Sequence, residues 1–142
     1  MRKILIILVV FIGSTYSCIM KGDPSTVSNF NIVNQTEHKL TLVTFSNADV
    51  LYDSLIIISK NTYLIKKVNQ SGVDFQLGDM KRGLVYFDDT ILYINYRDSL
   101  SDLPSGNILK LGDWSGGKVE DYLYEYEFKF TEEDYKEALK LQ

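Results

Sequence analysis

Apolar and polar residues alternate with a period of two through most of the chain after residue 28. The longest run is Tyr122 to Phe130, where aromatic residues occupy every second position and Leu, Glu and Lys stand between them. A period of two predicts an antiparallel strand with one buried face, so we expect these aromatic side chains to pack inward. Shorter stretches of the same kind predict further strands at 29–34, 39–45, 63–68, 73–77, 84–87 and 91–96.

Two polar segments predict turns between these strands. Residues 35–38 separate 29–34 from 39–45, which predicts that these two strands form a hairpin. Asp88, Asp89 and Thr90 favour a tight turn, because Asp tolerates the backbone angles that such turns require.

Two other stretches depart from the alternation. Leu55 to Ile58 is a continuous apolar run, which predicts a short strand that is buried on both faces. Residues 97–120 contain Pro104 and four glycines and predict an irregular loop.

A short helix is predicted after the aromatic strand. Thr131 is a favourable N-cap, and the three acids at 132–134 suit the positive end of the helix dipole. With seven or eight short strands before it, the fold class that we expect is mainly β: an antiparallel, immunoglobulin-like β-sandwich with a short C-terminal helix, spanning residues 29–142.

The first residues match the three parts of a secretion signal. Arg2 and Lys3 precede nine apolar residues, Ile4 to Ile12, and small residues follow. A membrane-spanning helix needs about 20 apolar residues, roughly twice this run. We therefore expect residues 1–17 to be a signal peptide and residues 18–28, which include Lys21-Gly22-Asp23-Pro24-Ser25, to be a flexible tether.

Cys18 indicates which kind of signal this is. It is the only cysteine, so it has no partner for a disulfide in an oxidising compartment. The segment Thr15-Tyr16-Ser17-Cys18 resembles a lipobox, although a bacterial lipoprotein usually has Leu where Thr15 stands and a smaller residue at Tyr16. The resemblance implies that Cys18 becomes the lipidated N-terminus. The alternative is ordinary cleavage near Ser17 that leaves a free thiol.

The mature region resembles a set of small bacterial lipoproteins of unknown function from Gram-negative gut bacteria. The likeness rests on Ile32-Val33-Asn34 in the first strand, Phe87-Asp88-Asp89 in mid-chain and Phe130 to Tyr135 near the end. It implies a β-sandwich in the cell envelope and assigns no catalytic residue. Ile19, in the place where Asp retains some lipoproteins at the inner membrane, favours the outer membrane by analogy.

Charge limits the partners. Without residues 1–17 the chain keeps 13 basic and 19 acidic residues, a net charge of −6. Such a surface repels nucleic acid and anionic lipid, so we expect no nucleic-acid partner and attachment to a membrane only through lipid on Cys18. Two acyl chains suffice for that attachment.

No pattern of catalytic or metal-ligating residues stands out. His38 is the only histidine and lies in a predicted turn, where we expect a solvated side chain. Zinc needs several His or Cys ligands, and the acidic clusters lack the spacing of a calcium loop. We therefore expect no metal, no cofactor and no enzymatic activity.

Trp114 is the remaining candidate contact residue. It is the only tryptophan and lies in the glycine-rich segment. An exposed tryptophan could stack on a sugar ring or contact a protein, whereas a buried one would close the sandwich edge. The function that we expect is an envelope-anchored, non-enzymatic binding or accessory module whose partner is an envelope protein or glycan. The alternative is a carboxylate-dependent hydrolase of envelope or dietary glycan.

Overall fold

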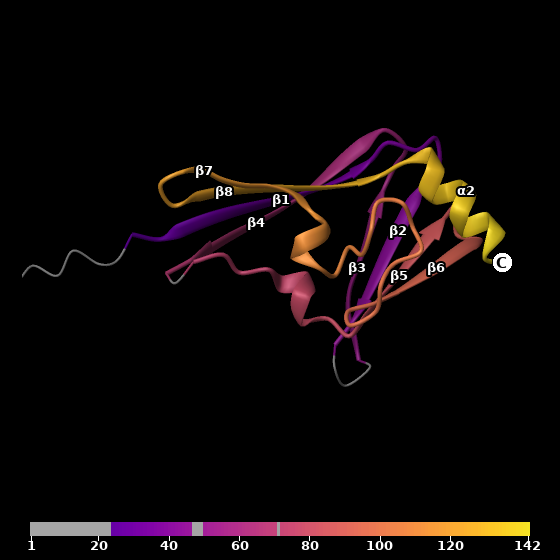
Figure 1. Cartoon of the computed structure of the whole chain (residues 1–142), viewed down its shortest axis with the longest axis horizontal. Helices are drawn as coiled ribbons and strands as arrows, with labels where there is room; N and C mark the ends of the chain where they lie inside the picture. The colour runs from indigo at the N-terminus through magenta and orange to yellow at the C-terminus, as the bar shows by residue number, and fades with distance from the viewer. Residues whose placement is uncertain (1–23, 47–49, 71) are drawn as a thin grey trace, which may run out of the picture.

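In the part of the chain that the structure describes, two four-stranded β-sheets and one C-terminal α-helix make up the fold (Figure 1). A computed structural model describes residues 24–46, 50–70 and 72–142. The first sheet has the strand order β4-β1-β8-β7 and the second has the order β3-β2-β5-β6. The strands are β1 (Thr26–Asn34), β2 (Leu40–Phe45), β3 (Leu51–Ile57), β4 (Asn61–Asn69), β5 (Arg82–Phe87), β6 (Ile91–Tyr96), β7 (Ser115–Glu120) and β8 (Leu123–Phe130); the helix is α2 (Glu132–Lys140).

The β-sandwich that the sequence predicts is confirmed, but its strand order differs from the immunoglobulin order. An immunoglobulin sheet places the first two strands side by side, whereas β1 and β2 lie in different sheets here. The predicted hairpin of these two strands is therefore wrong. β1 instead pairs with β4 in antiparallel and with β8 in parallel orientation. The β1–β8 pair is therefore an exception to the antiparallel pairing that the sequence predicts.

β1 begins at Thr26, so residues 26–28 belong to the sheet and not to the predicted tether. Thr26 and Ser28 face inward and are buried, while Val27 faces outward. The alternation is present here, but small hydroxyl residues occupy the buried positions, and the hydrophobic pattern alone does not reveal them. The flexible tether that we expect therefore ends before Thr26 and not at residue 28.

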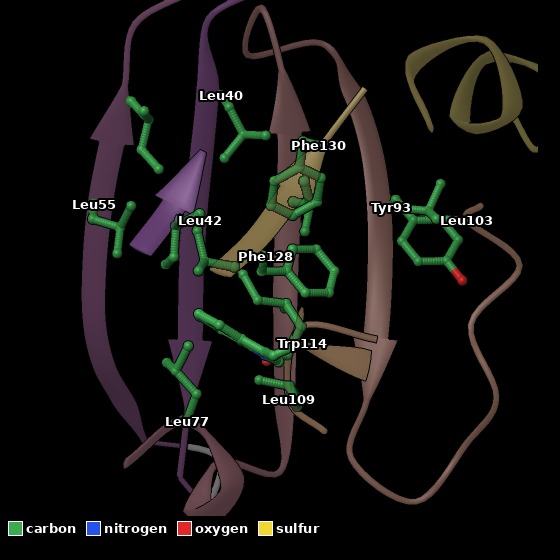
Figure 2. Close-up of a cluster of buried hydrophobic side chains, with 14 of the residues drawn as sticks. Leu40, Leu42, Leu55, Leu77, Tyr93, Leu103, Leu109, Trp114, Phe128 and Phe130 are labelled. Carbon is green, nitrogen blue, oxygen red and sulfur yellow. The ribbon is translucent and has the colours of Figure 1, made fainter. Parts of the chain in front are cut away.

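The core lies between the two sheets and is rich in aromatic and leucine side chains (Figure 2). β8 supplies Phe128 and Phe130, which are almost fully buried. The aromatic face of β8 thus points inward as predicted, but burial decreases toward its start: Tyr124 and Tyr126 are half-buried and the preceding Tyr122 is exposed.

β3 is buried on one face only, which corrects the prediction from its apolar run. Leu55 and Ile57 point into the core, whereas Ile56 and Ile58 are each 61% exposed. The run predicts two buried faces, and the single chain supplies a covering layer for only one of them.

Two stretches have a secondary structure other than the one that the sequence predicts. The predicted loop at 97–120 contains β7, and Gly116 in it has φ +112°; a Cβ there would lie 2.2 Å from the carbonyl oxygen of Glu125. Conversely, residues 73–77 form no strand. Phe75 and Leu77 instead pack on the core, Phe75 just before and Leu77 within a short 3₁₀ turn, η1 (Gln76–Asp79).

The C-terminal helix follows the predicted start signal. Thr131 is the N-cap, and Asp134 reaches back to accept the Thr131 N–H at 2.7 Å. The other oxygen of Asp134 accepts the Ser105 N–H at 2.8 Å, so the same buried carboxylate connects the helix to the 97–114 segment. Ala138 and Tyr135 hold the helix against the sandwich.

Asn34 is fully buried where β1 ends and the chain crosses to the other sheet. Its amide donates to the carbonyl oxygens of His38 and Ile57, at 2.8 and 3.1 Å, and its carbonyl oxygen accepts from the backbone and the hydroxyl of Thr36. One side chain thus satisfies the polar groups of a corner that would otherwise be buried unpaired.

We predict that Asn34→Ala lowers the free energy of unfolding by about 2–4 kcal/mol, because several buried backbone groups lose their partner. Urea unfolding followed by circular dichroism measures the change. Asn31→Ala, on the outward face of the same strand, is the matched control and should cost under about 1 kcal/mol. Equal losses in the two variants would contradict this role for Asn34.

Candidate functional site

Trp114 lies in the core, so the structure contradicts its role as an exposed contact residue. Its indole ring lies 5.5 to 5.8 Å, centroid to centroid, from the rings of Phe30, Phe75 and Phe128. The indole N–H donates to the carbonyl oxygen of Ile108 at 3.0 Å. Trp114 is therefore the plug at the sandwich edge, the alternative that the usual burial of tryptophan favours.

Residues 103–114 close this side of the sandwich, beside β6 and β7. Leu103, Ile108 and Leu109 are buried with Trp114, and Leu103 lies beside Tyr93 of β6 (Figure 2). Asn107 organises the segment: its side-chain amide donates to the Tyr96 carbonyl at 2.7 Å and to a second carbonyl of the loop.

The opposite side, between β3 and β4, is open. β3 and β4 are the neighbouring edge strands of the two sheets. A cleft of about 310 Å³ lies between them, a volume at the lower end of the range for ligand sites. Its floor is apolar and comes from both sheets and from η1: Leu42, Leu55, Ile65 and Leu77.

The rim of the cleft is polar and aromatic. Tyr52 and Asp53 line it on β3, and Tyr63 and Lys66 line it on β4. Both tyrosines are 40–49% exposed. The cleft therefore combines an apolar floor with hydrogen-bonding and charged groups of both signs, which is the composition of a site that holds an apolar group carried on a polar chain.

The sequence analysis did not identify these cleft residues. They lie in edge strands, and which edge stays open depends on tertiary packing. The closest signal in the sequence is the group of large apolar residues from Val50 to Val68, several of which are exposed in the structure.

His38 lies at a junction of three segments and is half-buried, not freely solvated as we expected. Its Nδ1 is 2.5 Å from Asp88 Oδ2, and its ring stacks on Tyr135 of α2 with centroids 3.6 Å apart. Glu132 lies 3.9 Å from Nε2. This cluster joins the β1–β2 and β5–β6 connections to the helix, and it contains no serine or cysteine nucleophile.

The hydrogen bond from His38 lowers the pKa of Asp88 below its usual value of 3.8, and the backbone N–H of Lys39 adds to the effect. Asp88 has φ +51° in the predicted tight turn, a conformation that Asp and Asn tolerate better than most residues. The carboxylate therefore stabilises the turn in its charged form.

Carboxylates also gather beside the N-terminus of α2. Asp113, Glu127 and Glu133 line a shallow hollow of about 350 Å³. Glu127 pairs with Lys129 at 2.6 Å and Asp113 accepts the N–H of Asn107 at 2.7 Å, so two of the three have partners within the chain. Within the described ranges, no group of three or more His, Cys, Asp or Glu side chains is placed to hold a metal ion.

The lipidation site that we expect, Cys18, lies outside the described residues. Among residues 24–46, 50–70 and 72–142, no helix is long and apolar enough to cross a membrane. Comparisons with protein-family models, curated proteins and solved structures found no match to this chain. The likeness to small bacterial lipoproteins therefore stays a prediction.

We predict that Asp88→Asn destabilises the fold at pH 7 and that the difference from the wild type disappears in acid. A lowered pKa means that the stabilisation is complete above the unfolded pKa near 3.8 and is lost as the pH falls through the folded value. Thermal melts at pH 7, 5, 3 and 2 measure this. A difference in Tm that persists at pH 2 would contradict the assignment to the carboxylate charge.

Proposed function

We propose that the protein is a lipid-anchored binding module of the bacterial cell envelope and that it has no enzymatic activity. The chain carries the signal pattern that ends at Cys18, and the domain that follows leaves one sandwich edge open over an apolar cleft. The observation that supports binding is this asymmetry: Trp114 and its neighbours close one edge, while the other edge keeps a cleft.

We propose that the cleft binds an extended peptide that inserts an apolar side chain between β3 and β4. The outer edge of β4 has no strand beside it among the described residues, so its backbone N–H and C=O groups can pair with an added strand. The floor accepts apolar side chains, and the rim offers Asp53 and Lys66 as charged partners for the flanking polar residues.

The anchoring half of this proposal is tested on the native protein. Mass spectrometry of the mature N-terminus should show Cys18 with a thioether-linked diacylglyceryl group, and Cys18→Ser should leave an unprocessed chain without lipid. An N-terminus at Cys18 with a free thiol would overturn the anchor without bearing on the cleft.

The cleft is tested with a library of displayed peptides selected against the immobilised protein. We predict that selected peptides carry apolar residues at alternate positions and that Tyr63→Ala weakens their binding at least about tenfold, since one of the two rim tyrosines is lost. Tyr122→Ala, at an exposed tyrosine of the distant β7–β8 turn, is the control and should leave affinity unchanged. Selection of no binders, or equal loss in both variants, would overturn the cleft as a peptide site.

A further inference from the structure

The outward face of the second sheet is apolar, which is unusual for an antiparallel sheet whose other face forms the core. In the row through its middle, Val43, Leu84 and Ile94 lie side by side on β2, β5 and β6. On the edge strand β3, Ile56 is more than half exposed, as is Leu51.

The rows on either side continue this surface. Tyr86 and Leu92 extend one of them, and Phe45 and Tyr96 extend the other. Among the outward positions that pair across β3, β2, β5 and β6 there is no carboxylate. The single charged side chain at these paired positions is Arg82, whose guanidinium lies 4.4 Å from the centre of the Phe45 ring. At the border of the face, Asp89 accepts from the Thr41 hydroxyl at 3.4 Å and pairs with Lys39.

The outward face of the first sheet has the opposite character. Asn29 and Asn31 occupy its central strand, and Glu125, Glu127 and Lys66 lie beside them on β8 and β4. Leu64 and Val68 on the edge strand β4 are exposed apolar residues of this face, but its middle rows centre on Asn29 and Asn31. Both sheets thus bury one face in the core, but only the second sheet has apolar side chains through the middle row of its outward face. This face also accounts for the continuous apolar run at 55–58, which is the pattern of a strand covered on both sides.

We infer that this apolar face of the second sheet packs against the same face of a second copy of the chain. A two-fold axis brings one patch onto an identical patch. The charged groups of this face lie outside its middle row: Arg82 sits on the Phe45 ring, and Asp89 pairs with Lys39 beside Thr41. The middle row therefore meets itself without opposed like charges. Four strands of six residues cover roughly 400 Å² in projection, so two copies bury on the order of 800 Å² or somewhat more, the area of a weak interface.

The lipid anchor, on which this inference depends, makes such a weak interface sufficient. Confinement of two copies to one bilayer raises their effective concentration and favours association without any new contact. The bilayer itself is the less suitable cover for this face. β1 begins at the end of the first sheet that projects away from the second sheet, so the first described residues lie far from the apolar face (Figure 1).

Cysteine crosslinking of the full-length chain in intact membranes tests the inference. Leu84→Cys places a thiol at the centre of the apolar face, and Asn29→Cys places one at the centre of the polar face. With Cys18 lipidated, each variant has one reactive thiol. A short bismaleimide should crosslink Leu84→Cys into a dimer at least ten times more efficiently than Asn29→Cys.

A second substitution separates loss of the interface from loss of folding. Adding Ile94→Arg should reduce the Leu84→Cys dimer at least tenfold, whereas adding Val68→Arg, at an exposed valine of the first sheet, should leave it intact; thermal melts confirm that both variants fold. Absence of the dimer in a folded, membrane-bound Leu84→Cys chain would overturn the inference. This includes the case in which lipid covers the face and keeps the bismaleimide from Leu84→Cys, because the face is then covered by the bilayer and not by a second copy. Crosslinking of the wild type through Cys18 would instead show that the anchor has failed.

Discussion

The packing of Trp114 among Phe30, Phe75 and Phe128 is the interaction on which the rest of the structure depends. These rings come from β1, β8 and two long connections, so one cluster joins segments that are far apart in sequence. Aromatic side chains bury more area than any others, and here they offset the cost of ordering connections that have little secondary structure of their own. The Trp114 cluster also decides which edge of the sandwich is closed.

Exposed apolar side chains are distributed unequally over the surface of the sandwich. The edge beside β6 and β7 is filled by residues 103–114, and the outward face of the first sheet carries asparagine and charged residues. Apolar surface remains at the β3–β4 edge and on the outward face of the second sheet. A cleft for a peptide and a face for a second copy can therefore coexist, because they lie on different sides of β3.

Local patterns predicted the elements whose stability is local. The alternation in β8 and the cap at Thr131 depend on neighbouring residues, and the structure has both. The sequence could not reveal features that depend on distant partners. β7 is a strand because it pairs with β8 despite its two glycines, and the crossing after β1 depends on the buried Asn34. For the same reason the sequence does not predict the open cleft. The pattern around Trp114 is compatible with an exposed contact residue and with a buried plug, and only its packing neighbours distinguish the two.

The fluorescence of Trp114 tests the central claim, that this side chain closes one edge from within, most directly because the chain has no other tryptophan. The account predicts an emission maximum shifted to short wavelength, little quenching by iodide in the folded protein, and a shift to long wavelength with full quenching in urea. A folded protein whose tryptophan emission is already at long wavelength and is quenched by iodide as strongly as in urea would contradict it.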